Sequence, residues 1–229
     1  GSEMCIRDSS TTFYVRINVM RIKISLFNNL KHNEPTSSPE LTTVFRNIKD
    51  GELSEEISHL RELYESGKLK EYKEEKSRSL PAVIFGVLCT SRAATFDKDG
   101  NKIGPTLNEK ITRVNKLLVI DYDDEANPNT DWASKRKEIE ADPHVLVTFL
   151  SPNGHGLKVL IPFSMVNRPN VKITNDLAGD RYFRASYKFC FDQITKYLGK
   201  YGLLADKSGS DPFRPVSYTH LTLPTSDLV

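Results

Sequence analysis

The stretch Leu117-Leu-Val-Ile-Asp-Tyr-Asp123 decides the fold that the sequence predicts. An apolar run that leads into alternating carboxylates is typical of a buried strand with a polar end. Because side chains alternate along a strand, Asp121 and Asp123 are expected on one face and Tyr122 on the other. Two carboxylates on one face can share divalent cations, and oxygen ligands suit Mg²⁺ or Mn²⁺. The alternative is an ordinary acidic junction between a strand and a loop.

The segments around this strand predict an α+β fold. Strands are expected at 116–120, 144–150, 157–161 and 201–206, with helices at 132–141 and about 180–198. This order favours a split βαβ sheet, like that of RNA-recognition modules, within residues 111–214. Residues 20–110 are expected to form an N-terminal lobe with a strand at 21–27, a helical hairpin at 54–78 and a strand at 80–85. The Lys/Glu run of that hairpin is interpreted as a solvated face.

The composition is that of a soluble globular protein. The 229 residues are 38% hydrophobic and 27% charged, with a net charge of +2. That charge does not indicate nucleic-acid binding by itself, although a balanced total can include a basic face. No apolar run approaches the roughly 20 residues of a transmembrane helix, so no membrane partner is expected. The three scattered cysteines, Cys5, Cys89 and Cys190, fit neither a zinc pattern nor a disulfide framework, which favours a reducing compartment and cytoplasmic localisation.

The two ends of the chain look unlike the rest. Gly1-Ser2 resembles the remnant of tag cleavage, and residues 3–9 and 215–225 resemble translated sequencing adapters from metagenomic assemblies. A natural start is expected at Met20. Residues 1–19 and 215–229 are therefore set apart from a domain at 20–214, and the natural protein is expected to continue beyond Arg214.

Two further segments are candidates for a nucleotide site. In Ser151-Pro-Asn-Gly-His-Gly-Leu-Lys158, two glycines permit a turn whose amides can meet an anion, and Ser151 and Lys158 can add a hydroxyl and a cation. In Asp206-Lys-Ser-Gly-Ser-Asp-Pro-Phe-Arg214, Asp206 follows an apolar segment and Arg214 could neutralise phosphate charge. Taken alone, each segment could equally be a surface turn.

Together these motifs resemble a known family. Residues 20–214 are similar to the primase-like domain called VirE amino-terminal, found in mobile elements and phages of Bacteroidetes, a branch of the archaeo-eukaryotic primase superfamily. The matching stretches are Lys23-Ile-Ser-Leu-Phe27, Leu80-Pro-Ala-Val, Leu118-Val-Ile-Asp-Tyr-Asp123, Phe149-Leu-Ser-Pro-Asn-Gly-His-Gly-Leu-Lys-Val159 and Tyr201-Gly-Leu-Leu-Ala-Asp-Lys-Ser208.

The resemblance implies a two-lobed primase-polymerase core with an RRM-like catalytic half, and it implies roles for individual residues. The catalytic and metal-binding residues would be Asp121, Asp123 and Asp206, with Asp211 as second choice for the third acid. The nucleotide-binding residues would be Ser151, Asn153, His155, Lys158, Asp211 and Arg214. Many relatives carry histidine where this chain has Lys158, which keeps the charge but does not accept a proton near neutral pH.

Three functions remain open at this point. The first is a DNA primase or polymerase that uses two Mg²⁺ or Mn²⁺ ions, nucleoside triphosphates and a single-stranded DNA template, with a downstream helicase domain as possible partner. The second is a non-catalytic module that binds single-stranded nucleic acid in a mobile-element replication helicase. The third is a metal-dependent nuclease.

Overall fold

The computed structural model describes residues 21–93, 95–96, 99, 102–104, 110–163 and 177–217. Residues up to 114, the N-terminal half, form β1 (Ser25–Phe27), α2 (Leu41–Asp50), α3 (Ser54–Glu65), α4 (Leu69–Ser79), β2 (Ala82–Ile84), β3 (Val87–Cys89), β4 (Thr95–Phe96), β5 (Lys102–Gly104) and β6 (Ile111–Val114). The C-terminal half forms β7 (Leu117–Asp123), α6 (Trp132–Glu140), β8 (Val147–Leu150), β9 (Gly156–Pro162), α7 (Leu177–Leu198), the 3-10 helices η1 (Gly199–Tyr201) and η2 (Lys207–Ser210), and β10 (Val216–Ser217). The α+β expectation is confirmed.

The sheet that carries the sequence motifs has the order β7-β9-β8. Both pairings are antiparallel, so β7 and β8 run parallel with β9 between them. Helix α6 connects the two parallel strands, which makes this unit the split βαβ arrangement that the sequence predicted.

The prediction of a fourth strand at 201–206 is wrong. After η1 the chain is extended but forms no strand, and one backbone hydrogen bond, from Asp206 N to Asp121 O (2.8 Å), joins it to β7. The physical reason lies in Asn127. Its side-chain amide donates to Leu204 O (2.9 Å) and its Oδ1 accepts from Leu204 N (2.7 Å). A side chain thus occupies the backbone groups that a strand ladder would need.

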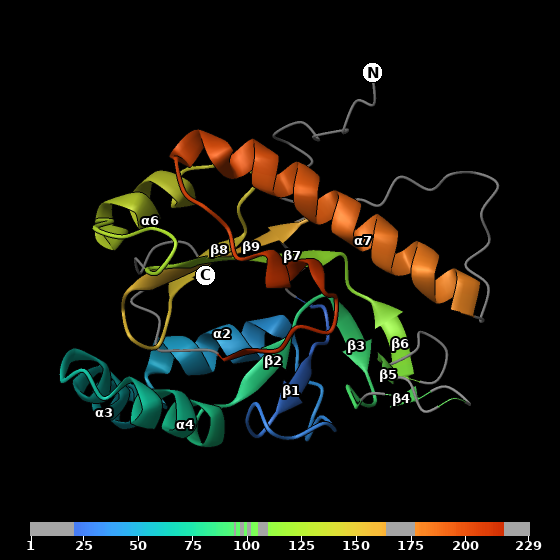
Figure 1. The fold of residues 1–229 in the computed structure, drawn as a ribbon, viewed down its shortest axis with the longest axis horizontal. Coiled ribbons are helices and arrows are strands. Elements are labelled where there is room, and N and C mark those ends of the chain that lie inside the picture. The colour runs from blue at the N-terminus through green and yellow to red at the C-terminus, as the bar shows by residue number, and fades with distance from the viewer. Residues whose placement is uncertain are drawn as a thin grey trace.

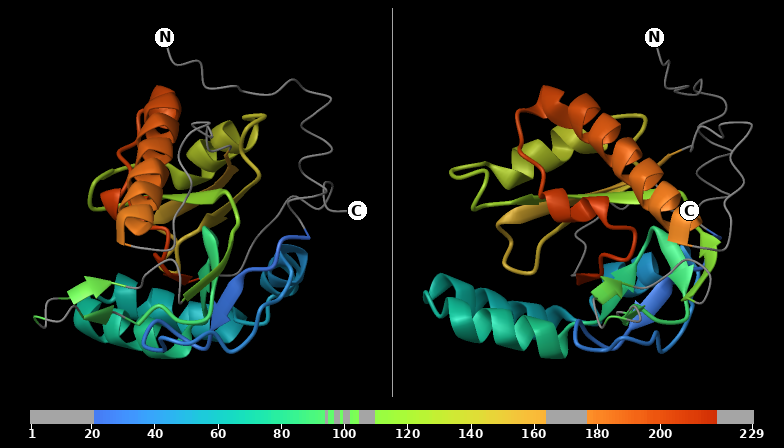
Figure 2. Two further views of the ribbon diagram at one scale, coloured as in Figure 1. Left: turned by 90° about the vertical axis from the view of Figure 1, so that its right-hand side faces the viewer. Right: turned by 45° about the vertical axis from the view of Figure 1, so that its right-hand side comes forward.

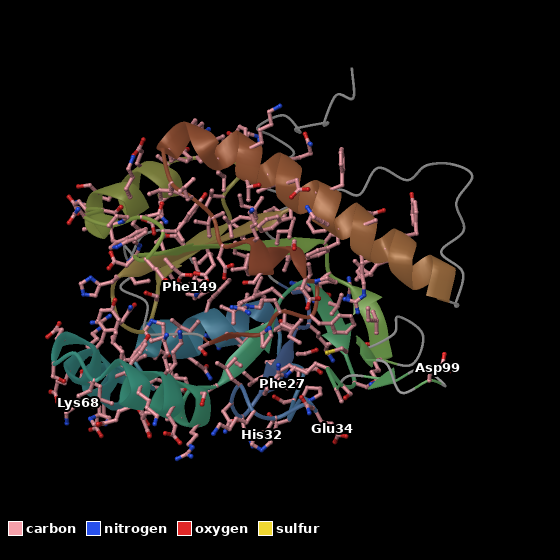
Figure 3. The ribbon with its side chains drawn as sticks, in the orientation of Figure 1. Phe27, His32, Glu34, Lys68, Asp99 and Phe149 are labelled. Carbon is pink, nitrogen blue, oxygen red and sulfur yellow. The ribbon has the colours of Figure 1, made fainter. Side chains whose placement is uncertain are left out.

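The two faces of this sheet pack against different partners. Leu118, Ile120 and Tyr122 belong to one buried cluster with residues of α6 and α7. Leu117 and Val119 belong to a second cluster with residues of α2 and β2. Figure 1 shows α6 and α7 on one side of the sheet and the N-terminal half on the other, and Figure 3 shows the fully buried Phe149 in the layer between the sheet and that half. Asp121 and Asp123, in phase with Leu117 and Val119, therefore face the N-terminal half.

The N-terminal half contains a second sheet with the order β1-β2-β10. Its edge strand β10 comes from the other end of the chain: Val216 pairs with Val83 and Ser217 with Ala82, and both β10 residues are buried. β10 thus includes two residues of the segment that the sequence analysis set apart from the 20–214 domain. Residues 1–19 and 218–229 lie outside the described part.

Helices α3 and α4 form the predicted helical hairpin, with a small core of Ile57, Leu60, Tyr72 and Leu80. Figure 2 shows this hairpin below the loop that joins β8 to β9. The hairpin thus lies on the side of the sheet to which the two aspartates of β7 point.

Cys89 and Cys190 are both free thiols, and Cys5 lies outside the described residues. Within the described residues, no helix combines the length and apolar character needed to cross a bilayer.

Candidate metal centre

Three carboxylates converge at the end of β7, and we call Asp121, Asp123 and Asp206 the acidic centre. One carboxylate oxygen from each lies within 4.8 Å of the others. The first two come from one face of a strand, as the sequence predicted. Asp206 is held by its backbone bond to Asp121 and by its side chain, which caps η2 and accepts from Ser208 N (2.9 Å). The spacing is short enough for the three residues to bind the same cations.

Two cations border the acidic centre. Lys158 lies opposite Asp121 in the β7–β9 register, and its buried Nζ forms an ion pair with Asp121 Oδ2. Arg214 Nη2 lies 3.7 Å from Asp206 Oδ2. The other oxygen of the first aspartate, Asp121 Oδ1, is buried and has no hydrogen-bond partner among the described residues. A buried carboxylate oxygen without a donor is costly, so it fits a site that a cation would complete.

The pKa of Asp123 reflects its partial burial and the negative charges of the carboxylates beside it. Partial burial, followed by the negative charge of Asp121, raises the pKa of the Asp123 carboxyl. Burial also acts to raise the pKa of Asp206, but the hydrogen bonds from Ser208 and the charges of Arg214 and Lys158 outweigh it and leave that pKa below its usual value. A divalent cation would relieve the repulsion at Asp123, so the donor set fits Mg²⁺ or Mn²⁺.

The 151–156 loop is shaped by its own side chains. Ser151 Oγ donates to Asn153 Oδ1, which also accepts from His155 N (3.1 Å). Gly154 adopts a left-handed φ of 80°, a conformation that glycine reaches without strain. The His155 ring stacks on Tyr64 of α3, with ring centroids 5.2 Å apart. Ser151 and Asn153 thus hydrogen-bond each other, and a nucleotide-binding role for these two and His155 stays a prediction.

Asp211 and Arg214 belong to the segment that follows η2. Both line a narrow pocket with Asp121, next to Gly86 and the η2 turn. Asp211 pairs with Arg184 Nη1 (3.3 Å) and accepts from Phe213 N (3.0 Å). The structure therefore brings Asp206, rather than the second choice Asp211, into the acidic centre.

Sequence reasoning missed one residue at the site, Lys76 of α4. It interacts electrostatically with Asp121 and Asp123 and with Lys158, and burial followed by repulsion from Lys158 lowers its pKa to about 8. The Lys/Glu run was expected to be a solvated face, and for Lys76 that expectation is wrong. A signal was available, because Tyr72 is the one buried residue of this charged helix and Lys76 lies one turn further on the same face.

The comparisons with known proteins found one family. A family model described as "BT4734-like, N-terminal domain" matches residues 75–220 of the 229. The match spans β2 to β10 and includes every residue of the acidic centre. Neither the curated proteins nor the solved structures contain a match to the chain.

Proposed function

The chain belongs to the BT4734-like N-terminal domain family, and we propose that its acidic centre catalyses template-directed nucleotidyl transfer, as a DNA primase or polymerase. The reaction joins a 3′-hydroxyl oxygen to the α-phosphorus of a nucleoside triphosphate and releases pyrophosphate. The observation that carries the proposal is the convergence of three carboxylates within 4.8 Å, bordered by Lys158 and Arg214.

Asp121, Asp123 and Asp206 would hold the divalent cations. When bound, two such ions activate the attacking hydroxyl and stabilise the leaving pyrophosphate. Lys158 lies where its ammonium can bind a phosphate oxygen beside Asp121, and Arg214 offers a guanidinium fork at the edge of the pocket. Binding and orienting the triphosphate is thus the task of the chain's own cations.

The finer assignments belong to this proposal. They are membership of the archaeo-eukaryotic primase superfamily in its VirE amino-terminal branch, a two-lobed primase-polymerase core, and single-stranded DNA and a helicase domain as partners. They are supported by the sequence motifs and by the split βαβ unit that carries Asp121 and Lys158. The placement of the acidic centre between the sheet and the N-terminal half is compatible with a site built from two lobes.

The test is incorporation of labelled nucleotide on single-stranded DNA with Mg²⁺ or Mn²⁺. We expect the double variant Asp121→Asn/Asp123→Asn to lose incorporation by about 100-fold or more, as when groups that stabilise transition-state charge are removed. Asp124→Asn is the matched control, because its carboxylate neighbours the centre without belonging to it. Equal incorporation by the wild type and the double variant would refute catalysis by these residues, and DNA degradation without nucleotides would identify a nuclease instead.

One observation favours a second function, a non-catalytic module that binds single-stranded nucleic acid. The ion pair of Lys158 with Asp121 occupies a carboxylate oxygen that a metal would use. If this function is correct, DNA affinity will be insensitive to Mn²⁺ and to the Asp121→Asn/Asp123→Asn change, and nucleotides will not bind. A DNA affinity that depends on either would exclude it.

A further inference from the structure

The α3–α4 hairpin is attached to the loop beside the acidic centre. Arg61 Nε donates to Pro152 O (3.4 Å), and Tyr64 stacks on His155. Tyr64 also packs edge-on against Tyr72 of α4, with ring centroids 5.3 Å apart. The hydrogen bond and the stacked pair therefore attach the part of the hairpin near its turn, where Lys68 lies (Figure 3), to the 151–156 loop, and the Tyr64–Tyr72 pair joins the two helices of the hairpin.

This attachment sets the position of Lys76. Its Nζ lies 5.7 Å from the centroid of the Tyr72 ring, and the charges of Asp121, Asp123, Lys158 and Arg214 all act on it. The side chain is partly buried, yet within the described residues it has neither an ion pair nor a hydrogen bond. The carboxylates of the acidic centre act on this ammonium without a direct hydrogen bond, so it is available to donate to the oxygens of a bound anion.

We propose that Lys76 binds the phosphate chain of the nucleoside triphosphate, together with Lys158 and Arg214. The three cations come from α4, from β9 and from the segment after η2, and each interacts electrostatically with at least one carboxylate of the acidic centre. This inference rests on the proposed function and adds to it a phosphate-binding residue from the N-terminal half. The α3–α4 hairpin thereby contributes a residue to the substrate site.

A simpler role for Lys76 would be to offset the negative charge of the acidic centre. The two roles predict different effects of removing Lys76 on the affinities for Mn²⁺ and for a polyphosphate. Removing a cation near carboxylates strengthens the binding of Mn²⁺ in either case, because repulsion between cations is lost. The affinity for a polyphosphate falls only if Lys76 touches it, and both affinities fall if the substitution merely disturbs the fold.

The experiment is calorimetric titration of the full chain with inorganic tripolyphosphate and, separately, with Mn²⁺. We expect Lys76→Ala to weaken tripolyphosphate binding by about 10-fold, the effect of losing one charged hydrogen bond, and to leave Mn²⁺ binding equal or tighter. Lys76→Arg should retain most of the tripolyphosphate affinity. Lys73→Ala, on the exposed face of the same helix, should match the wild type.

Unchanged tripolyphosphate affinity in Lys76→Ala would overturn the inference, and so would a parallel loss of both ligands. Failure of the proposed function gives a different result. If the wild type binds no Mn²⁺, the carboxylates are not a metal centre. The tripolyphosphate comparison between wild type and Lys76→Ala, made without metal, would then still decide the role of Lys76.

Discussion

Gly156 is a residue of the site that leaves no room for a side chain. It begins β9, pairs with Asp123 across the sheet and sits beside the 151–156 loop. A Cβ at this position would lie 2.7 Å from Tyr122 O and 2.9 Å from Ser151 Oγ. One of these atoms is backbone of the strand that carries both aspartates, so the strain cannot be relieved by turning a side chain.

We therefore expect Gly156→Ala to lower the free energy of unfolding by about 1–3 kcal/mol, as overpacking does, and to weaken Mn²⁺ binding because β9 shifts against β7. Chemical denaturation and Mn²⁺ titration measure the two effects. Gly199→Ala is the matched control, since nothing lies within 4 Å of its added Cβ. Equal stability of the two variants would contradict a clash between a Cβ at position 156 and Tyr122 O or Ser151 Oγ.

Among the elements, the segment between η1 and η2 shows how Asp206 reaches β7 without a strand. The buried Asn127, in the turn after β7, donates to Asp123 O and to Leu204 O (both 2.9 Å) and accepts from Leu204 N. One side chain thus joins the end of β7 to the segment that leads to Asp206. The third carboxylate is therefore positioned by a side-chain bridge rather than by a sheet ladder.

Asn127→Ala should lower the free energy of unfolding by roughly 1–2 kcal/mol, because it removes three hydrogen bonds and leaves the partly buried N–H and C=O groups of Leu204 without the Asn127 side chain. It should also weaken Mn²⁺ binding, since Asp206 loses its support. Denaturation and calorimetry test this pair of effects. Glu125→Ala, at an exposed position of the same turn, is the control. Wild-type Mn²⁺ affinity in Asn127→Ala would show that Asp206 is held by other contacts.

For the whole molecule, the decisive feature is that the two ends of the described chain meet in one sheet. β10 pairs with β2, and Val216 joins the same buried cluster as Val119 on the central sheet. Arg214 lies two residues before Val216 and is therefore anchored close to the pocket beside Asp121. The C-terminal strand thus connects the stability of the N-terminal half to the geometry of the site.

Val216→Ala is expected to lower the free energy of unfolding by about 2 kcal/mol, the loss of buried methyl groups plus the cavity that remains. Leu204→Ala removes more carbon atoms, but its side chain is 67% exposed, so its cost should be well under 1 kcal/mol. Urea denaturation of both variants makes the comparison. A Val216→Ala protein as stable as Leu204→Ala would mean that β10 contributes little to the fold.

The sequence by itself determined the elements with strong local periodicity and the chemistry that they carry. The apolar run and alternation at 117–123 were enough to predict a buried strand with Asp121 and Asp123 on one face and Tyr122 on the other, and the burial of this strand confirms it. Side-chain direction along a strand depends only on neighbouring residues, so it can be read without knowledge of the rest of the chain.

Only the tertiary structure decided which distant segments meet at that strand. It placed Asp206 rather than Asp211 beside the aspartate pair, replaced the expected strand at 201–206 by the bridge from Asn127, and brought Lys76 within electrostatic reach of the site. These outcomes depend on how the hairpin and the C-terminal segment pack against the sheet. Packing between segments far apart in sequence leaves no local periodic signal, which is why a charged helix looked solvated until its partner was known.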